Sequence, residues 1–267
     1  MAGSNREIVD ALQLRGFRVV SHSGGDNLPF SLDLQEPFLT RLYDAMKRYS
    51  FRLFMRDVIQ RKAGFSASQV CGYSSHTTAS KYIKVLLTCG LVERKGSSQY
   101  RLVSDRAYSF GDSLAWLVAE VLRREFGCPS LWNVRLTRSR AGGDYDVLAL
   151  TQGHLVYLEV KSSPPKHIEQ KEVAAFLTRV QALAPQCAVF LEDTQLRMKD
   201  KIVPFFEAEL PRFWKQKGLP VSHPQRKRRE IFVAGSNCFI TNSHPDLVRN
   251  IGFCISSYLH STGGLKP

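Results

Sequence analysis

The sequence predicts an α/β protein in which a mixed sheet is flanked by helices, with a smaller and mostly α-helical domain upstream. Three observations predict this class. Residues 37–103 show short helical patterns separated by tight turns, followed by two short strand patterns. Residues 144–161 contain two apolar segments of strand length around a tight turn. A helical segment then leads into a wholly apolar strand at 187–191, which is the order of a parallel strand–helix–strand crossover.

Length and composition are those of a folded protein. The 267 residues can bury a large core and are enough for two domains. Hydrophobic content of 43% and charged content of 23% are ordinary. No apolar run approaches the ~20 residues of a membrane-spanning helix, and the N-terminus lacks the apolar centre of a signal peptide. We therefore expect a cytoplasmic protein with no membrane partner.

The cysteine spacing argues against a disulfide framework or a zinc site. The six cysteines are scattered along the chain, and no two of them form a CxxC pair. Buried, reduced thiols are the expected state.

The charge balance indicates a polyanionic partner. Lys and Arg number 37 against 24 Asp and Glu, so the formal net charge is +13 and the pI is about 9.6. Nucleic acid is the first candidate for that partner. An anionic membrane surface is the rival, but no strongly amphipathic basic helix supports it.

Residues 1–36 are predicted to be an N-terminal extension. Residues 6–14 have the pattern of a short helix, and residues 17–20 that of a strand. The sequence assigns no function to this segment.

Residues 37–103 contain a regular succession of helices. One helix is expected over 37–49, and a second begins near Phe51. Ser66 can cap a short helix at 67–71, and Ser75 a longer one at 76–89 that stops at Gly90. Two short strands, 91–94 and 99–102, follow around a loop that contains Lys95.

This succession resembles a winged helix-turn-helix domain, in which the second helix of the pair enters the major groove and the hairpin contacts the DNA backbone. The resemblance covers about 65 residues of the chain and rests on a pattern without a diagnostic motif. It implies that the polar face of the longer helix and the hairpin loop bind nucleic acid, through Thr77, Thr78, Lys81, Lys84 and Lys95. The alternative is a winged helix used only for protein contacts or dimerisation.

The second domain is predicted over 104–267. An apolar stripe between Leu114 and Leu122 marks a helix that ends at Gly127. Further helices are expected over 168–183 and 246–259. Further strands are expected at 187–191, 231–234 and 239–241.

The hairpin at 144–161 carries the strongest chemical signal. If Gln152-Gly153 is a two-residue turn, Asp146 faces Glu159 and Asp144 faces Lys161, with all four side chains on one face. Opposed carboxylates roughly 5 Å apart at Cβ repel one another. This arrangement predicts a cation between them and therefore a metal site. The alternative is a surface hairpin whose charges form ordinary ion pairs.

The order helix, Asp-bearing strand, Glu-x-Lys strand, helix, strand over 111–191 resembles the PD-(D/E)XK nuclease superfamily. The resemblance implies a restriction-endonuclease-like fold and phosphodiester hydrolysis. It implies that Asp146, Glu159 and the carbonyl of Val160 hold the metal. Lys161 would orient or deprotonate the attacking water, or stabilise developing charge.

The implied cofactor is Mg²⁺, with Mn²⁺ as a substitute. A divalent ion stabilises charge on the phosphate and lowers the pKa of bound water. Mg²⁺ keeps several waters, so two carboxylates and a carbonyl are enough protein ligands.

Other residues near the motif have less defined roles. Glu120 is the candidate for the glutamate that many relatives carry on the first helix, although Ala115 stands where some relatives have it. Lys166 directly follows the motif and could reach a phosphate or belong to an ordinary loop. Relatives also use a polar residue on the following helix. Three residues are available for that role: Gln170, Lys171 and Arg179.

The leading hypothesis is a metal-dependent nuclease with DNA as its substrate and a second copy of the chain as a candidate partner. A catalytically inactive, DNA-binding regulator or assembly factor is the alternative from another class. An RNA-processing nuclease is a third hypothesis, because positive charge does not distinguish the two polymers. The charge run at 225–229 could bind phosphates, or it could be a solvated loop.

Overall fold

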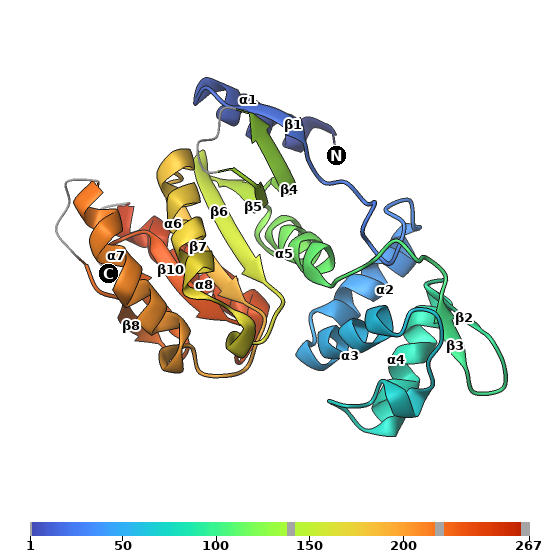
Figure 1. Cartoon of the computed structure of the whole chain (residues 1–267). Coiled ribbons are helices and arrows are strands. Elements are labelled where there is room, and N and C mark those ends of the chain that lie inside the picture. Colours follow the sequence, from blue (N-terminus) through green and yellow to red (C-terminus); the bar gives the residue numbers. More distant parts are fainter. Residues whose placement is uncertain (1, 138–141, 217–221, 263–267) are drawn as a thin grey trace. The chain divides into compact units, whose positions relative to one another are not determined.

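The computed structural model describes residues 2–137, 142–216 and 222–262 of the chain (Figure 1). It contains two compact units, which are described separately. The larger unit comprises Met1–Ser23 and Val118–Pro267, and the smaller comprises Gly24–Leu117. Helix α5 (Gly111–Phe126) contributes residues to both units.

The smaller unit has the predicted order of elements. These are α2 (Glu36–Met46), α3 (Tyr49–Gln60), the 3₁₀ turn η1 (Ala67–Gln69), α4 (His76–Thr88), β2 (Val92–Arg94) and β3 (Tyr100–Leu102). Helix α4 is capped by Ser75 as predicted, since the Ser75 hydroxyl accepts a hydrogen bond of 3.1 Å from the Thr78 N–H. The helix is followed by Gly90, whose φ is +69°. The short helix expected at 67–71 is only a three-residue 3₁₀ turn.

The larger unit is built on an eight-stranded mixed sheet with the order β1-β4-β5-β6-β7-β10-β9-β8. Its strands are β1 (Arg18–Ser21), β4 (Ser130–Thr137), β5 (Asp144–Thr151), β6 (His154–Lys161), β7 (Cys187–Glu192), β8 (Gln225–Arg228), β9 (Ile231–Ala234) and β10 (Cys238–Asn242). Its other helical elements are α1 (Ala2–Leu14), η2 (Pro165–His167), α6 (Gln170–Leu183), η3 (Met198–Asp200), α7 (Ile202–Gln216) and α8 (Leu247–Thr262). This confirms the predicted mixed sheet flanked by helices and is consistent with a restriction-endonuclease-like α/β fold.

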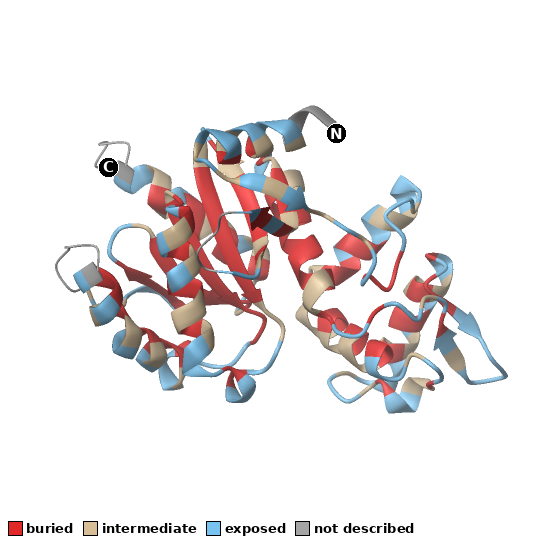
Figure 2. Ribbon diagram, turned by 45° about the horizontal axis from the view of Figure 1, so that its top comes forward, coloured by how far each residue is buried: buried red, intermediate tan, exposed pale blue. Residues whose placement is uncertain are grey.

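Helices cover the two faces of this sheet because side chains alternate along each strand (Figure 2). Phe190 on β7 packs its ring against Phe176 of α6 and Phe206 of α7. Cys187, three residues earlier on β7, projects from the opposite face and lies near Cys254 of α8. The sheet is therefore the central layer, with α6 and α7 on one face and α8 on the other.

The β5–β6 hairpin has the predicted turn and register. Gln152 and Gly153 have φ values of +49° and +77°, as a two-residue type I′ turn requires. The strands pair from Thr151 opposite His154 to Val147 opposite Leu158. Strand β6 then pairs with β7 in parallel, which confirms the predicted crossover.

Several elements differ from the sequence expectations. Strand β4 and helix α7 were not predicted. The charge run at 225–229 is mostly the edge strand β8 rather than a loop. Strand β1 pairs with β4, so residues 1–23 belong to the larger unit, whereas the sequence separates 1–36 as an extension. The chain passes from one unit to the other between residues 23 and 24 and between residues 117 and 118. The domain boundaries expected from the sequence are instead 36/37 and 103/104.

Two general expectations can be compared with the structure. All six cysteines are free, and all but Cys71 are buried. Over the described residues, no helix has the length and hydrophobicity needed to cross a bilayer.

Candidate active site at the end of the β5–β6 hairpin

Asp146 and Glu159 come together where the hairpin ladder ends. The paired ladder ends at Val147 and Leu158, and these two acids occupy the next position on each strand. The Asp146 carboxylate accepts a hydrogen bond of 2.8 Å from the Val160 N–H. Burial, and then the nearby charge of Glu159, raise the pKa of Asp146 to about 8. The predicted approach of the two carboxylates is therefore present in the structure.

Glu159 is buried and surrounded by donors. Its side chain is 2% exposed. One carboxylate oxygen accepts from the Arg179 guanidinium at 2.6 Å and lies 2.9 Å from the Lys161 ammonium. The other oxygen accepts from the Tyr157 hydroxyl. The negative charge of Glu159 is thus balanced by two cations from β6 and α6.

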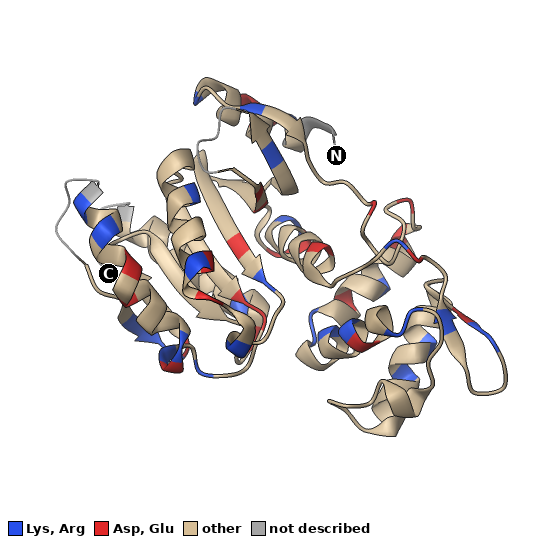
Figure 3. Cartoon of the chain, in the orientation of Figure 1, with Lys and Arg blue, Asp and Glu red and all other residues tan. Residues whose placement is uncertain are grey.

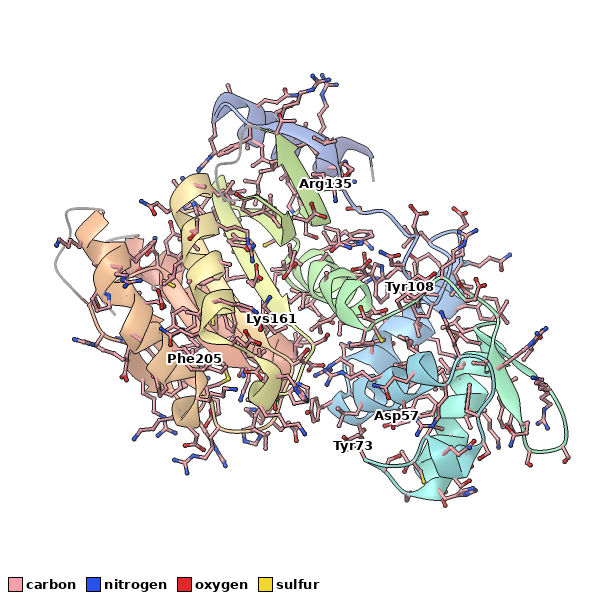
Figure 4. All side chains as sticks on the ribbon, viewed as in Figure 1. Asp57, Tyr73, Tyr108, Arg135, Lys161 and Phe205 are labelled. Carbon is pink, nitrogen blue, oxygen red and sulfur yellow. The ribbon has the colours of Figure 1, made fainter. Side chains whose placement is uncertain are left out.

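Lys161 ends strand β6 (Figure 4) and contacts two acids. Its ammonium is 2.9 Å from Glu159 and 3.1 Å from Glu172 of α6. Burial lowers the pKa of Lys161, but the nearby carboxylates outweigh this effect and the net direction is upward. Lys161 therefore stays protonated in this arrangement, which suits charge stabilisation better than proton abstraction.

Arg179 and Tyr157 complete the cluster. Arg179 also donates to the Tyr157 hydroxyl at 2.9 Å, so one guanidinium contacts both Glu159 and the tyrosine that donates to Glu159. Of the three candidates on the following helix, Arg179 contacts the acids. Gln170 instead donates to Glu209, and Lys171 pairs with Glu169.

Sequence reasoning missed Tyr157 and Glu172. The signal for Tyr157 was available, because it lies two residues before Glu159 and four before Lys161 and so shares their face of β6. Glu172 lies on another element, and no local pattern connects it to Lys161.

The oxygen atoms of Asp146, Glu159 and Val160 are of the hard type that Mg²⁺ prefers. The Lys161 carbonyl accepts from the Asp193 N–H on the β7 side of β6. Peptide groups alternate in direction along a strand, so the carbonyl of Val160 points with its N–H towards β5 and Asp146. The Val160 carbonyl and the carboxylates of Asp146 and Glu159 then lie near the boundary between β5 and β6, and all three are hard oxygen ligands.

This donor set is small, and waters would have to complete it. Within residues 2–137, 142–216 and 222–262, no group of three or more His, Cys, Asp or Glu is arranged to hold a metal. An ion would also compete with Arg179 and Lys161 for the oxygens of Glu159.

Asp144 and Glu120 have other partners. Asp144 lies opposite Arg135 of β4 and accepts from that guanidinium at 2.9 and 3.1 Å. The paired ladder of β5 and β6 ends at Val147 and Leu158, before it reaches Asp144 and Lys161. Glu120 is buried on α5 and accepts from Arg123 at 3.1 Å and Arg124 at 2.6 Å. Both arginines would have to move for Glu120 to hold a metal.

The predicted nucleic-acid contacts are mostly at the surface. In the smaller unit, basic residues lie on α4 and on the β2–β3 hairpin (Figure 3). Thr77, Lys81 and Lys84 are exposed on α4, and Lys95 is exposed in the loop between β2 and β3. Thr78 is partly buried, and its hydroxyl lies 3.0 Å from that of Ser75.

Lys166 belongs to the larger unit, where it is exposed in η2. It directly follows the Glu-x-Lys strand, as the sequence indicates. Its side chain is therefore available to an external ligand.

Comparison with known proteins shows similarity at the level of structure. No family model matches the sequence, and no match was found among curated proteins. Protein VC1899 from Vibrio cholerae aligns with a TM-score of 0.54 at 13% identity over 97% of this chain. The alignment covers 62% of that protein, so this chain spans less than two thirds of its length. Can2 from Sulfobacillus thermosulfidooxidans, solved in complex with cyclic tetra-adenylate, aligns with a TM-score of 0.47 at 14% identity, covering 74% of this chain and 55% of that one. At such identities the likeness to VC1899 concerns the fold alone.

Proposed function

We propose that this protein is a metal-dependent nuclease that hydrolyses phosphodiester bonds in DNA. The observation that carries the proposal is the close approach of Asp146 and Glu159 beside Lys161 at the open end of the hairpin. A carboxyl group whose pKa is strongly raised, beside a second carboxylate and a lysine, is the kind of arrangement that catalytic sites use.

Each residue has a distinct role in this proposal. Asp146, Glu159 and the Val160 carbonyl would hold Mg²⁺ or Mn²⁺, which supplies Lewis acidity and a water of lowered pKa when bound. Lys161, kept protonated by its acidic neighbours, would face the negative charge that develops on the phosphate. Arg179 would act as a positioning residue that orients Glu159 from α6.

The smaller unit would bind DNA. Thr77, Lys81 and Lys84 share an exposed surface of α4, and Lys95 adds a cation on the neighbouring hairpin. An exposed polar helix beside a basic hairpin fits the winged-helix mode of contact.

The test is a cleavage panel with the full chain, using single- and double-stranded DNA and RNA with Mg²⁺ or Mn²⁺. Asp146→Asn and Lys161→Gln should each reduce cleavage by about 100-fold or more while DNA binding is retained. Lys171→Gln, on the exposed surface of α6, is the matched control and should cleave normally. Retained cleavage in both site variants would remove the assignment, and cleavage of RNA alone would change the substrate.

A second candidate function is a DNA-binding regulator with an inactive nuclease fold. One observation favours it: Glu159 is already satisfied by Arg179, Lys161 and Tyr157 without a metal. Tight DNA binding without cleavage in either metal would support this candidate over the first.

A further inference from the structure

The candidate site and the far edge of the sheet are connected by continuous backbone pairing. Across β6, β7, β10, β9 and β8, the paired residues are Glu159, Phe190, Ile240, Phe232 and Arg226. Arg226 on the edge strand therefore lies level with Glu159 along the strand direction. Neighbouring strands are ~4.8 Å apart, so four steps place β8 about 19 Å from β6.

The edge strand β8 and its turn are strongly cationic. Arg226, Lys227, Arg228 and Arg229 follow one another without an intervening acid, and all four are exposed. The guanidinium of Arg228 lies 4.5 Å from the centre of the Phe253 ring, which holds this part of the edge against α8. Four consecutive cations would repel the same strand of a second copy. Their charge instead favours an anionic ligand.

The segments between β6 and β8 are linked at this end of the sheet. The Lys201 ammonium donates to the carbonyl of Lys166 at 2.9 Å, which connects the segment after β7 to the one after β6. The Met198 N–H donates to buried Glu230 at 2.8 Å, which connects the same segment to the β8–β9 turn.

These links join residues 165–167, 197–201 and 226–230 into one surface, which we call the cationic rim. Its exposed basic side chains include Lys166, Arg197, Lys199 and Arg229. Two acids lie within the rim. Glu230 is buried and accepts from the Met198 N–H, and exposed Asp200 lies 3.8 Å from Arg197 and offsets part of its charge. The basic residues of the rim outnumber these two acids.

We propose that the cationic rim binds the phosphate backbone of the nucleic acid that enters the candidate site; this rests on the proposed nuclease function. The distance of about 19 Å corresponds to about six nucleotides along one strand of a duplex. The substrate strand then has to extend about six nucleotides to one side of the cleaved bond for full binding.

A membrane surface fits the rim less well than nucleic acid. Interfacial membrane binding requires a substantial apolar face beside the cations. Leu196, which is 60% exposed, is the large exposed apolar residue next to the rim in the described part of the chain. One leucine is a small apolar area compared with the number of cations.

The experiment compares two double variants of the full chain, each without two exposed positive charges of the larger unit. Lys199→Gln with Arg229→Gln removes two positive charges from the rim. Arg6→Gln with Arg18→Gln removes two from the opposite end of the unit, on α1 and β1. Both are made in an Asp146→Asn background, so that binding is measured without cleavage.

Binding of a fluorescent DNA duplex is followed by anisotropy over a series of salt concentrations. The rim variant should lower the slope of log K against log salt by about 2, and the control should leave it nearly unchanged. Lys199→Arg with Arg229→Lys should restore the slope, since it keeps both charges. A duplex in which the strand extends fewer than about six nucleotides beyond the candidate site cannot reach β8. With such a duplex, the rim variant and its parent should show the same slope.

The rim proposal would be overturned if the rim variant and its parent had equal slopes of log K against log salt. It would also be overturned if the rim variant and the control variant lost equal amounts of that slope. A loss of binding to phosphatidylserine vesicles with unchanged DNA binding would overturn it as well. If the rim variant lowers the salt slope but the wild-type protein cleaves no nucleic acid, the nuclease function is refuted and the rim proposal stands. If the wild-type protein cleaves DNA but the rim variant leaves the salt slope unchanged, the rim proposal alone is refuted.

Discussion

Asp146 and Glu159 lie side by side in very different electrostatic environments. Glu159 is balanced by Arg179 and Lys161, whereas Asp146 accepts a hydrogen bond from the backbone N–H of Val160. Burial and the charge of Glu159 therefore favour the protonated form of Asp146. A bound divalent cation would reverse this preference by favouring the carboxylate.

This imbalance predicts how stability depends on pH in the metal-free protein. The pKa of Asp146 is raised from 3.8 to about 8, so between these values the folded state keeps a proton that the unfolded chain has released. The free energy of unfolding should then fall as pH rises, by up to about 1.4 kcal/mol per pH unit. Asp146→Asn removes the contribution of Asp146 to this pH dependence. The melting temperature of the variant should therefore fall less than that of the wild type between about pH 4 and pH 8.

The measurement is thermal unfolding followed by circular dichroism in a chelating buffer. Asp144→Asn is the matched control on the same strand, because its carboxylate already pairs with Arg135 at the surface, and it should follow the wild-type slope. Parallel curves for wild type and Asp146→Asn would show that Asp146 is not held protonated. Added Mg²⁺ should flatten the wild-type curve if Asp146 is a ligand.

At the scale of elements, the β5–β6 turn decides which side chains meet. Gln152 and Gly153 both have positive φ, and this two-residue turn sets the register that ends with Asp146 beside Glu159. A slip by one residue would move one of these acids to the other face of the sheet. The chemistry of the site therefore depends on a turn at the opposite end of the two strands.

Substitutions in this turn should change stability in opposite directions. Gly153→Ala places a side chain at a φ of +77° and should lower the free energy of unfolding by about 1 kcal/mol. Gln152→Asn should raise it by a few tenths, because Asn tolerates positive φ better than Gln. Urea denaturation measures both changes. Gly24→Ala, where the added Cβ would meet open space, should stay within about 0.5 kcal/mol of wild type, and a similar result for Gly153→Ala would contradict the turn assignment.

At the scale of the whole molecule, the net charge of +13 is distributed over both units (Figure 3). The smaller unit presents Lys81 and Lys84 on α4, and the larger presents the cationic rim. If both surfaces contact phosphates, each contributes separately to the salt dependence of binding.

Lys81→Gln with Lys84→Gln tests the contribution of the smaller unit. The slope of log K against log salt for duplex DNA should fall by about 2, because each phosphate contact contributes about 0.9. Arg41→Gln with Arg48→Gln removes two exposed charges from the same unit outside α4 and is expected to change the slope little. An unchanged slope in the α4 variant would favour the alternative in which this unit contacts proteins.

Much of the fold follows from local sequence patterns. The helix at 76–88 was predictable because Ser75 and Gly90 mark its ends, and the β5–β6 hairpin because its turn residues separate two apolar strands. Strand β4 was missed, although it pairs with both β1 and β5. Its pairing with β1 joins residues far apart in the chain, and that contact also assigns residues 1–23 to the larger unit.

By itself, the sequence determined the hairpin, its register and the approach of Asp146 to Glu159, because strand pairing through a two-residue turn is local. Only the tertiary structure decided the partners of that pair. Arg179 and Glu172 come from α6, and the cations of β8 reach the level of Glu159 across four strand pairings. These contacts depend on how α6 packs on the sheet and on the strand order, and both are consequences of burying the shared hydrophobic core.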